Sequence, residues 1–262
     1  MRASLVAPAV AAVLMASSAA LWIGQDGSEG PPGGPVGPGL RPLAAPAPVV
    51  APPTTRPRPP SCRVADGPVT GDPNLDWATI VVDTARALPL GFVPPSLVGV
   101  DHAGFDTTDL VRLEVIADLG AMRSAAAAAG APFVVASGYR SGDYQRDLFA
   151  RRVAEVGLAE ASLRSARPGH SEHQLGTAVD VLDPGSTELT AAFAFTPAGI
   201  WVAAHAHEFG FVVSYPAGSR DRTCYEFEPW HLRYVGRPVA AAIHRSRLTP
   251  REWMLTRADD PA

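Results

Sequence analysis

Apolar residues recur with two different periods between residues 75 and 256, and these periods predict which segments are helices and which are strands. Helical spacing predicts helices over 76–88 and 109–129, and Pro89 and Gly130 stand where those helices would stop. The apolar face of the longer helix is expected to carry Leu113, Ile116, Leu119 and Met122.

Signals at helix ends predict three more helices. Ser141 is a suitable N-cap for a helix over 141–156, and a Thr-Pro pair starts another over 196–210. Thr249 and Glu252 have the spacing of a capping box, which predicts the start of the last helix.

Short apolar runs bounded by turn residues predict four strands. Helices and short strands are therefore interspersed, and no phosphate-binding glycine loop follows a strand. The pattern predicts a mixed α and β domain. The predicted strands cover 132–137, 177–182, 211–215 and 231–235.

The N-terminal residues have a pattern that does not belong to this domain. Residues 3–24 carry no charge and follow a single arginine, which predicts that 1–24 is a signal peptide or a membrane anchor. The length favours a retained anchor, whereas the small residues at 16–20 are compatible with cleavage; a buried core helix is the remaining alternative. We expect an exported protein, either anchored on the extracellular face of the membrane or secreted to the cell wall.

A proline-rich segment follows. Residues 31–60 hold 12 of the 27 prolines, a composition that cannot bury a core. We expect 25–60 to be a disordered linker, either a plain tail or an extended spacer, in which residues 31–60 would reach about 90 Å at ~3.1 Å per residue. The folded domain is then predicted to cover 61–262.

Composition excludes several mechanisms. All 22 basic residues are arginine, so the chain has no lysine for a P-loop, a pyridoxal-phosphate Schiff base or a Ser-x-x-Lys peptidase. The formal net charge is −4, and no basic stripe is present of the kind that nucleic-acid binding requires. We therefore expect no nucleic-acid partner.

The chain has two cysteines, Cys62 at the start of the domain and Cys224 near its end. In an exported protein such a pair favours a disulfide, and two unpaired thiols are the alternative. No Cys-x-x-Cys pair and no neighbouring histidine supports a metal role for them. The bond would tie the start of the domain to a loop near the residues considered next.

One candidate metal-binding segment runs from Ser171 to Asp180. His173 precedes a glycine turn at Gly176, and Asp180 lies on the strand that follows. A chain reversal at that glycine would bring the imidazole and the carboxylate together, and both are suitable zinc ligands. Glu172 is a weaker ligand candidate.

A second segment, Glu228-Pro-Trp-His231, offers a third ligand and a base. His231 would complete three protein ligands and leave the fourth position to water, which is the pattern of catalytic zinc sites. Glu228 lies three residues earlier and can reach that position to accept a proton.

These residues carry a resemblance to a known family. The segments Ser171-x-His173-x-x-Gly176-x-Ala178-x-Asp180 and Glu228-Pro-Trp-His231 resemble the motifs of the VanY-like D-alanyl-D-alanine carboxypeptidases, which are zinc peptidases of the M15 group (M15B). The resemblance extends over most of 75–256. It implies an α+β fold of the Hedgehog/DD-peptidase type, a small antiparallel sheet flanked by helices.

The resemblance also implies a role for each matching position. His173, Asp180 and His231 resemble the zinc ligands, and Glu228 the general base and acid. Arg140 resembles the residue that polarises the scissile carbonyl and stabilises the oxyanion, a role that suits a permanent cation with directed donors. The implied substrate contacts are hydrogen bonds from Gln145 and Ser171 to the terminal residue and its carboxylate, with Trp230 as a wall.

The remaining histidines, tyrosines and acidic residues that were considered are better explained by structural roles than by chemistry. His102 and His244 are expected to be packing or surface residues. His205 and His207 are two apart in a helical segment and point to different sides, so a metal motif is not expected there. His170 is expected to line the site without being a ligand. The tyrosines Tyr139, Tyr215 and Tyr234 are expected in the core or cleft wall, and Asp183 in a turn.

Together these observations predict a monomeric, exported zinc carboxypeptidase that removes the C-terminal D-amino acid from peptidoglycan stem peptides. It would contact the membrane only through an uncleaved N-terminal segment. Rivals with the same fold are an L,D-carboxypeptidase and a peptidoglycan endopeptidase. Rivals of another class are a non-catalytic wall-binding zinc domain and a regulatory zinc module.

Overall fold

The computed structural model describes residues 62–258. The predicted signal peptide or anchor at 1–24 and the predicted linker at 25–60 lie outside the described residues. Within 62–258, none of the helices combines the length and the apolar character that crossing a bilayer needs.

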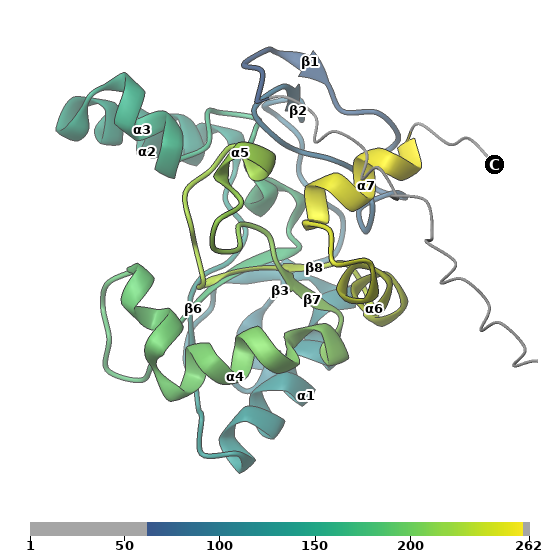
Figure 1. Cartoon of the computed structure of the whole chain (residues 1–262), viewed down its shortest axis with the longest axis vertical. Helices are drawn as coiled ribbons and strands as arrows, with labels where there is room; N and C mark the ends of the chain where they lie inside the picture. The colour runs from purple at the N-terminus through teal and green to yellow at the C-terminus, as the bar shows by residue number, and fades with distance from the viewer. Residues whose placement is uncertain (1–61, 259–262) are drawn as a thin grey trace, which may run out of the picture. The chain divides into compact units, whose positions relative to one another are not determined.

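A four-stranded antiparallel sheet forms the centre of the described domain (Figure 1). The strand order is β5-β6-β8-β7, with β6 and β8 in the middle. This sheet and its helices confirm the predicted α+β class. The strands are β5 (Val134–Ser137), β6 (Ala178–Leu182), β7 (Phe211–Val213) and β8 (His231–Tyr234).

Helices lie on both sides of this sheet. In Figure 1, α1 and α4 lie on one side, and α2, α3, α5 and α7 on the other, with α6 beside β7. The helices are α1 (Leu113–Ala128), α2 (Gly142–Val156), α3 (Leu158–Arg164), α4 (Pro197–His205), α5 (Arg220–Thr223), α6 (Arg237–Ser246) and α7 (Pro250–Ala258). Four 3₁₀ helices are described: η1 (Val100–Ala103), η2 (Glu172–Leu175), η3 (Ala191–Phe195) and η4 (Ala206–Phe209).

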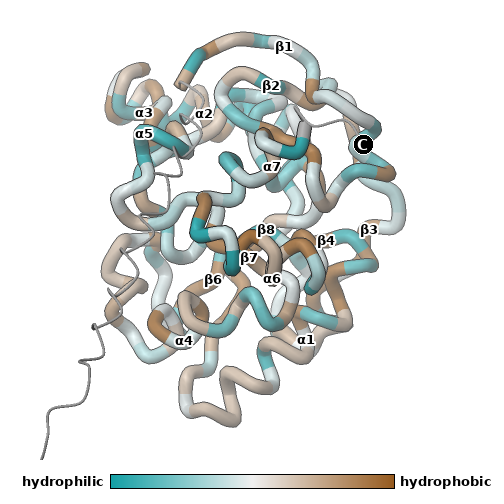
Figure 2. Tube along the Cα trace, turned by 45° about the vertical axis from the view of Figure 1, so that its right-hand side comes forward, coloured by the Kyte–Doolittle hydropathy of each residue, from teal (hydrophilic) through white to brown (hydrophobic). Residues whose placement is uncertain are grey.

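The main core fills the space between the sheet and the helices α1 and α4. All five residues of β6 are buried, as expected for a central strand covered on both faces. The hydropathy colouring shows apolar segments at β7 and β8, in the middle of the described domain (Figure 2). The core residues include Val115, Leu119 and Met122 of α1, Val179 and Val181 of β6, and Val202 of α4.

The predicted helix caps are confirmed. The Ser141 hydroxyl accepts the Tyr144 N–H at 3.1 Å. At the start of α7, the Glu252 carboxylate accepts the Thr249 N–H at 2.9 Å, and the Thr249 hydroxyl accepts the Glu252 N–H at 3.2 Å. Each cap satisfies N–H groups that a helix start leaves without a partner.

The predicted helix over 76–88 is wrong. The chain makes a turn at 76–80, runs extended to Asp83 and turns again at 84–85. It then forms the short strand β2 (Arg86–Ala87), which pairs in parallel with β1 (Gly67–Pro68). Residues 80–83 are all buried, whereas a surface helix buries only one face. The β-branched run Ile80-Val-Val82 also favours the extended conformation.

The predicted helix over 109–129 starts later than expected. Residues 110–112 form β4 (Leu110–Arg112), which pairs with β3 (Leu97–Gly99), and α1 begins at Leu113. Leu113 is exposed and does not belong to the buried face. The local periodicity did not reveal the partner strand, because sheet pairing is a long-range contact.

The predicted disulfide between Cys62 and Cys224 is present. It joins residues 162 apart in the sequence, with the two Cα atoms 5.3 Å apart. A cross-link across so long a segment restricts the unfolded chain strongly.

We expect the double variant Cys62→Ser with Cys224→Ser to lose about 2–5 kcal/mol of unfolding free energy, because its unfolded chain is no longer restricted. Urea unfolding of the variant and the oxidised wild type tests this, and equal midpoints would contradict it.

Candidate metal centre and active site

Three predicted ligands converge at the centre of the sheet. His173 lies on η2, Asp180 on β6 and His231 on β8. The Asp180 Oδ1 lies 3.1 Å from the His231 Nδ1 and 3.3 Å from the His173 Nε2. The two ring nitrogens are 3.2 Å apart. Three donor atoms are therefore directed at one point, an arrangement that can hold a metal ion.

The backbone explains this convergence. Asp180 and His231 are direct partners in the antiparallel register of β6 and β8, so their side chains share one face. The chain reverses at Gly176, which has a left-handed φ of 71°. A Cβ at this position would lie 3.0 Å from the side chains of Pro94 and Leu97. Glycine thus permits the turn that brings His173 back toward Asp180.

Hydrogen bonds orient both imidazoles. The His173 Nδ1 donates to the Gly138 carbonyl at 2.7 Å, which leaves Nε2 as the free ligand atom. The His231 Nε2 donates to the Glu172 carboxylate at 2.9 Å, which leaves Nδ1. Outer hydrogen bonds of this kind fix the tautomer of metal-ligating histidines. Two neutral imidazoles and one carboxylate fit zinc, with a position open for water or substrate.

The electrostatics of the site favour a cation between the ligands. Burial alone would lower the pKa of His231, but the hydrogen bonds that it donates to Asp180 and Glu172 raise that pKa to about 10. A proton thus occupies the Nδ1 position, and a metal ion would displace it to give the neutral ligand. The pKa of Asp180 is held well below its ordinary value, because His173, His231 and Arg140 outweigh the cost of burial. The cluster therefore stabilises positive charge next to an ionised carboxylate.

Glu172 does not belong to the ligand set, although its neighbourhood made it a weak candidate. One of its carboxylate oxygens accepts the Ser214 hydroxyl at 2.6 Å in addition to His231, and the other accepts Arg233 at 2.8 Å. Burial would raise the pKa of Glu172, but Arg233 and His231 lower it to about 2. Arg233 was not predicted, although its position two residues after His231 on one strand face was a usable signal.

We expect Glu172→Gln to weaken zinc binding by about 10–100-fold, because the amide removes the negative charge that orients and polarises His231. Glu114→Gln, on the exposed first turn of α1, is the matched control. Competition with a chromogenic chelator measures both affinities. Equal zinc affinities for the two variants would show that Glu172 does not support the metal centre.

Glu228 lies beside this cluster and faces the cleft. Its Oε2 is 4.0 Å from the His231 Nδ1, and the side chain is largely buried. Burial raises the pKa of Glu228 to about 7, with His231 opposing the shift. The backbone N–H of Glu228 donates to the Tyr215 carbonyl at 3.1 Å, which holds the residue in place. A carboxyl group in this state is suited to accept and return a proton near neutral pH.

The predicted substrate contacts line one cleft of about 390 Å³ together with the three ligands and Glu228. Arg140 donates to the Asp180 Oδ2 at 3.0 Å, so it is anchored to a ligand and not free in solvent. Its Nε is buried and has no hydrogen-bond partner among residues 62–258. The structure thus brings Arg140, Gln145, Ser171 and Trp230 to the same cleft.

Gln145 is buried, and its amide nitrogen donates to the Ala166 carbonyl at 2.7 Å. Its Oε1 has no hydrogen-bond partner in the described part of the chain. An amide oxygen accepts hydrogen bonds and does not bind a carboxylate, so Gln145 suits a donor on the substrate better than the terminal carboxylate itself.

The other histidines do not reach the metal cluster. His170 contacts the Asp83 carbonyl and the Asp66 carboxylate and does not line the cleft, so the prediction that it lines the site is wrong. His207 and His244 stack face to face, with ring centroids 3.6 Å apart. His205 contacts Glu208 on the exposed side of the same segment.

Comparison with known proteins agrees with this geometry. Residues 108–237 match the family model described as VanY, D-alanyl-D-alanine carboxypeptidase. One solved structure, of a vancomycin-resistance D,D-pentapeptidase VanY mutant in complex with Zn(II), is 30% identical with a TM-score of 0.58. The match covers 68% of this chain and 99% of that one.

The chain belongs to the VanY family. It is also similar to the LD-carboxypeptidase LdcB, with 36% identity and a TM-score of 0.60 over 67% of this chain and 84% of that one. Among curated proteins, "Putative carboxypeptidase YodJ" of Bacillus subtilis is 37% identical. That match spans 66% of this chain and 65% of YodJ, just under two thirds of the relative's length. The segment that matches the family model contains the three ligands and Glu228.

Proposed function

We propose that the chain is a zinc-dependent D-alanyl-D-alanine carboxypeptidase that removes the terminal D-amino acid from peptidoglycan stem peptides. One observation carries the proposal: a largely buried glutamate, Glu228, faces a cleft in which His173, Asp180 and His231 direct three ligand atoms at one point. Membership in the VanY family and a zinc-bound VanY neighbour support the metal and the substrate class.

In this mechanism each side chain has one task. Zinc held by His173, Asp180 and His231 would supply a Lewis acid at the scissile carbonyl. Glu228 accepts a proton from the attacking water and later gives it to the leaving amine as the C–N bond breaks. Arg140 lines the cleft and offers its guanidinium to the oxygen on which negative charge develops.

The remaining cleft residues bind the substrate. Gln145 and Ser171 lie on the same cleft as the catalytic group, from α2 and from the residue before η2. They provide hydrogen bonds for the last residue of the peptide. Trp230 packs between the cleft and the main core, and it forms an apolar wall there.

An L,D-carboxypeptidase is the second candidate, because LdcB is 36% identical to this chain. The two activities use the same metal centre and differ in the residue before the scissile bond. Pentapeptide and tetrapeptide stems, incubated separately with the zinc-loaded protein and analysed by mass, separate them. D-Ala release from the pentapeptide alone supports the proposal, and release from the tetrapeptide alone overturns it in favour of the second candidate.

We also propose that the protein acts outside the cytoplasm as a monomer, with residues 1–24 as a signal peptide or anchor and 25–60 as a spacer. The uncharged N-terminal run, the proline content and a disulfide in the folded domain support this placement. Cell fractionation followed by N-terminal sequencing of the mature protein tests it. Recovery of the intact chain only from the cytoplasmic fraction would contradict it.

A further inference from the structure

We infer that Asp83 and Arg251 are positioning residues for Glu228, because together they hold the loop that carries it. Neither residue lies in the segment 108–237 that the VanY model matches. The inference deepens the proposed function and rests on it, since the reaction is the readout. Residues 219–230 are called the catalytic loop below.

The catalytic loop forms one wall of the cleft. It contains the single-turn helix α5 and continues to β8, and Tyr225, Phe227 and Glu228 face the cleft from it. Beyond α5 the Glu226 N–H donates to the Leu163 carbonyl, the Glu228 N–H donates to the Tyr215 carbonyl, and the Trp230 carbonyl accepts the Val181 N–H. Only four residues, 224–227, separate α5 from Glu228. The position of α5 therefore influences where the Glu228 carboxylate lies.

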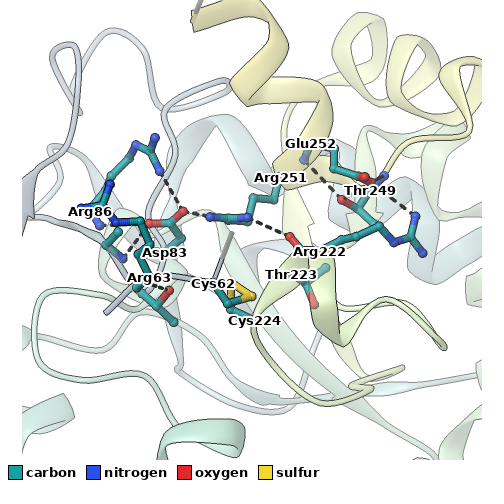
Figure 3. Close-up of polar contacts among 12 residues, drawn as sticks. Cys62, Arg63, Asp83, Arg86, Arg222, Thr223, Cys224, Thr249, Arg251 and Glu252 are labelled. Carbon is teal, nitrogen blue, oxygen red and sulfur yellow. Dashed lines mark hydrogen bonds and ion pairs between the residues drawn. A yellow bond between two sulfur atoms is a disulfide. The ribbon is translucent and has the colours of Figure 1, made fainter. Parts of the chain in front are cut away.

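Arg251 connects α5 with Asp83 and does not line the cleft (Figure 3). Its Nη1 donates to the Arg222 carbonyl at 2.9 Å, and its Nε donates to the Asp83 carboxylate at 2.8 Å. Arg251 is 8% exposed and Asp83 is 2% exposed, so solvent screens this ion pair little. The planar guanidinium fixes the direction of both hydrogen bonds at once, which a lysine ammonium does not.

Asp83 is itself fixed, and it also contacts the segment that leads to the ligand His173. Its Oδ1 accepts the backbone N–H groups of Ala85 and Arg86, both at 2.9 Å. Its carbonyl accepts the His170 Nδ1 at 2.6 Å, three residues before the ligand His173. Asp83 thus connects the segment that leads to a zinc ligand with the loop that carries the base.

The disulfide adds a covalent attachment at the same place. Cys224 follows α5 directly and is bonded to Cys62, which lies beside Asp83 and Arg251 in Figure 3. The catalytic loop is thus held at Arg222 by a hydrogen bond and at Cys224 by the disulfide. Cys224 lies four residues before Glu228. A displacement of about 1 Å at a catalytic group costs up to ~100-fold in rate. Loss of the Arg251 contacts is therefore expected to appear in catalysis as well as in stability.

The test compares Asp83→Asn, Arg251→Gln, Arg251→Lys and the double variant Asp83→Asn with Arg251→Gln, all as zinc-loaded full chains. Arg237→Gln is the matched control, because it removes the ion pair between Arg237 and Asp118 away from the cleft. For each protein, zinc content, unfolding temperature, kcat and KM for D-Ala release are measured below the unfolding transition. Arg251→Lys keeps the charge and serves where the glutamine variant does not fold.

We expect kcat to fall about tenfold or more in Arg251→Gln, with one zinc per chain retained and KM within about twofold of wild type. Arg251→Lys should recover the unfolding temperature more fully than kcat, since one ammonium replaces two directed donors. The double variant should lose little more than the worse single variant, because the residues act as one unit.

A kcat within twofold of wild type in the Arg251 variants, or an equal loss in Arg237→Gln, would overturn the positioning role and leave only a structural one. Additive losses in the double variant would also contradict it. Absence of D-Ala release by the wild type would instead contradict the proposed function. The two failures are therefore distinguishable.

Discussion

Replacing Glu228 by glutamine is expected to lower kcat by about 10³-fold while zinc remains bound. The carboxylate is not one of the three ligands, and it is held beside them by the backbone of the catalytic loop. The amide has nearly the same size and cannot accept a proton from water. The metal centre and the cleft should therefore persist without the proton transfer. Glu228→Ala should behave in the same way.

Metal analysis and single-turnover kinetics on the Glu228→Gln protein test this expectation. Glu114→Gln, with its side chain on the first turn of α1, is the control for removal of one carboxylate. Retained turnover in Glu228→Gln would remove Glu228 from the mechanism. Loss of zinc from that variant would mean that Glu228 is a ligand and not the base.

Replacing His231 by alanine is expected to abolish both zinc binding and activity. His231 occupies the centre of the cluster: its Nδ1 contacts Asp180 and its Nε2 contacts Glu172. Without it, two ligands remain, and the buried carboxylates of Asp180 and Glu172 lose their common partner. Removing one partner from a buried charge network is costly even though Arg140 and Arg233 still pair with these carboxylates, so the unfolding temperature should also fall. His173→Ala should lose zinc as well.

The effect of a chelator on the unfolding temperature separates a loss of zinc binding from general destabilisation. A chelator should lower the unfolding temperature of the wild type, because a ligand that binds only the native state stabilises it. The same chelator should leave His231→Ala unchanged. His244→Ala, on α6 and outside the cluster, should respond like the wild type. One equivalent of tightly bound zinc in His231→Ala would refute its assignment as a ligand.

Local signals in the sequence predicted those parts of the fold that local chemistry determines. Ser141 and the Thr249–Glu252 box fixed the starts of α2 and α7, because a cap needs only residues within one turn. The predicted helix over 76–88 is wrong for the opposite reason. Its spacing fits a helix, but tertiary packing buries Ile80 to Asp83 as an extended run, with Val81 and Asp83 against α7. Ile80 and Val82 pack in a separate small cluster.

The ligand cluster was predictable because its motifs are compact, and the turn at Gly176 could be argued from one glycine. The contacts of the residues that surround the cluster were not predictable. Glu172 and Arg233 were visible as letters near the motifs, but their pairing depends on the register of β6 and β8. Asp83 and Arg251 are 168 residues apart, and no spacing rule connects them. Long-range ion pairs of this kind become apparent only in the folded chain.

The most direct test of the account is a zinc titration of the metal-free protein, with D-Ala release from a pentapeptide stem as the signal. We expect no release before zinc is added, a linear rise in rate, and saturation at one zinc per chain. Each turnover should yield one D-Ala and one tetrapeptide by mass. Release that is equally fast in the metal-free protein, or that stays absent at full zinc occupancy, would contradict the account.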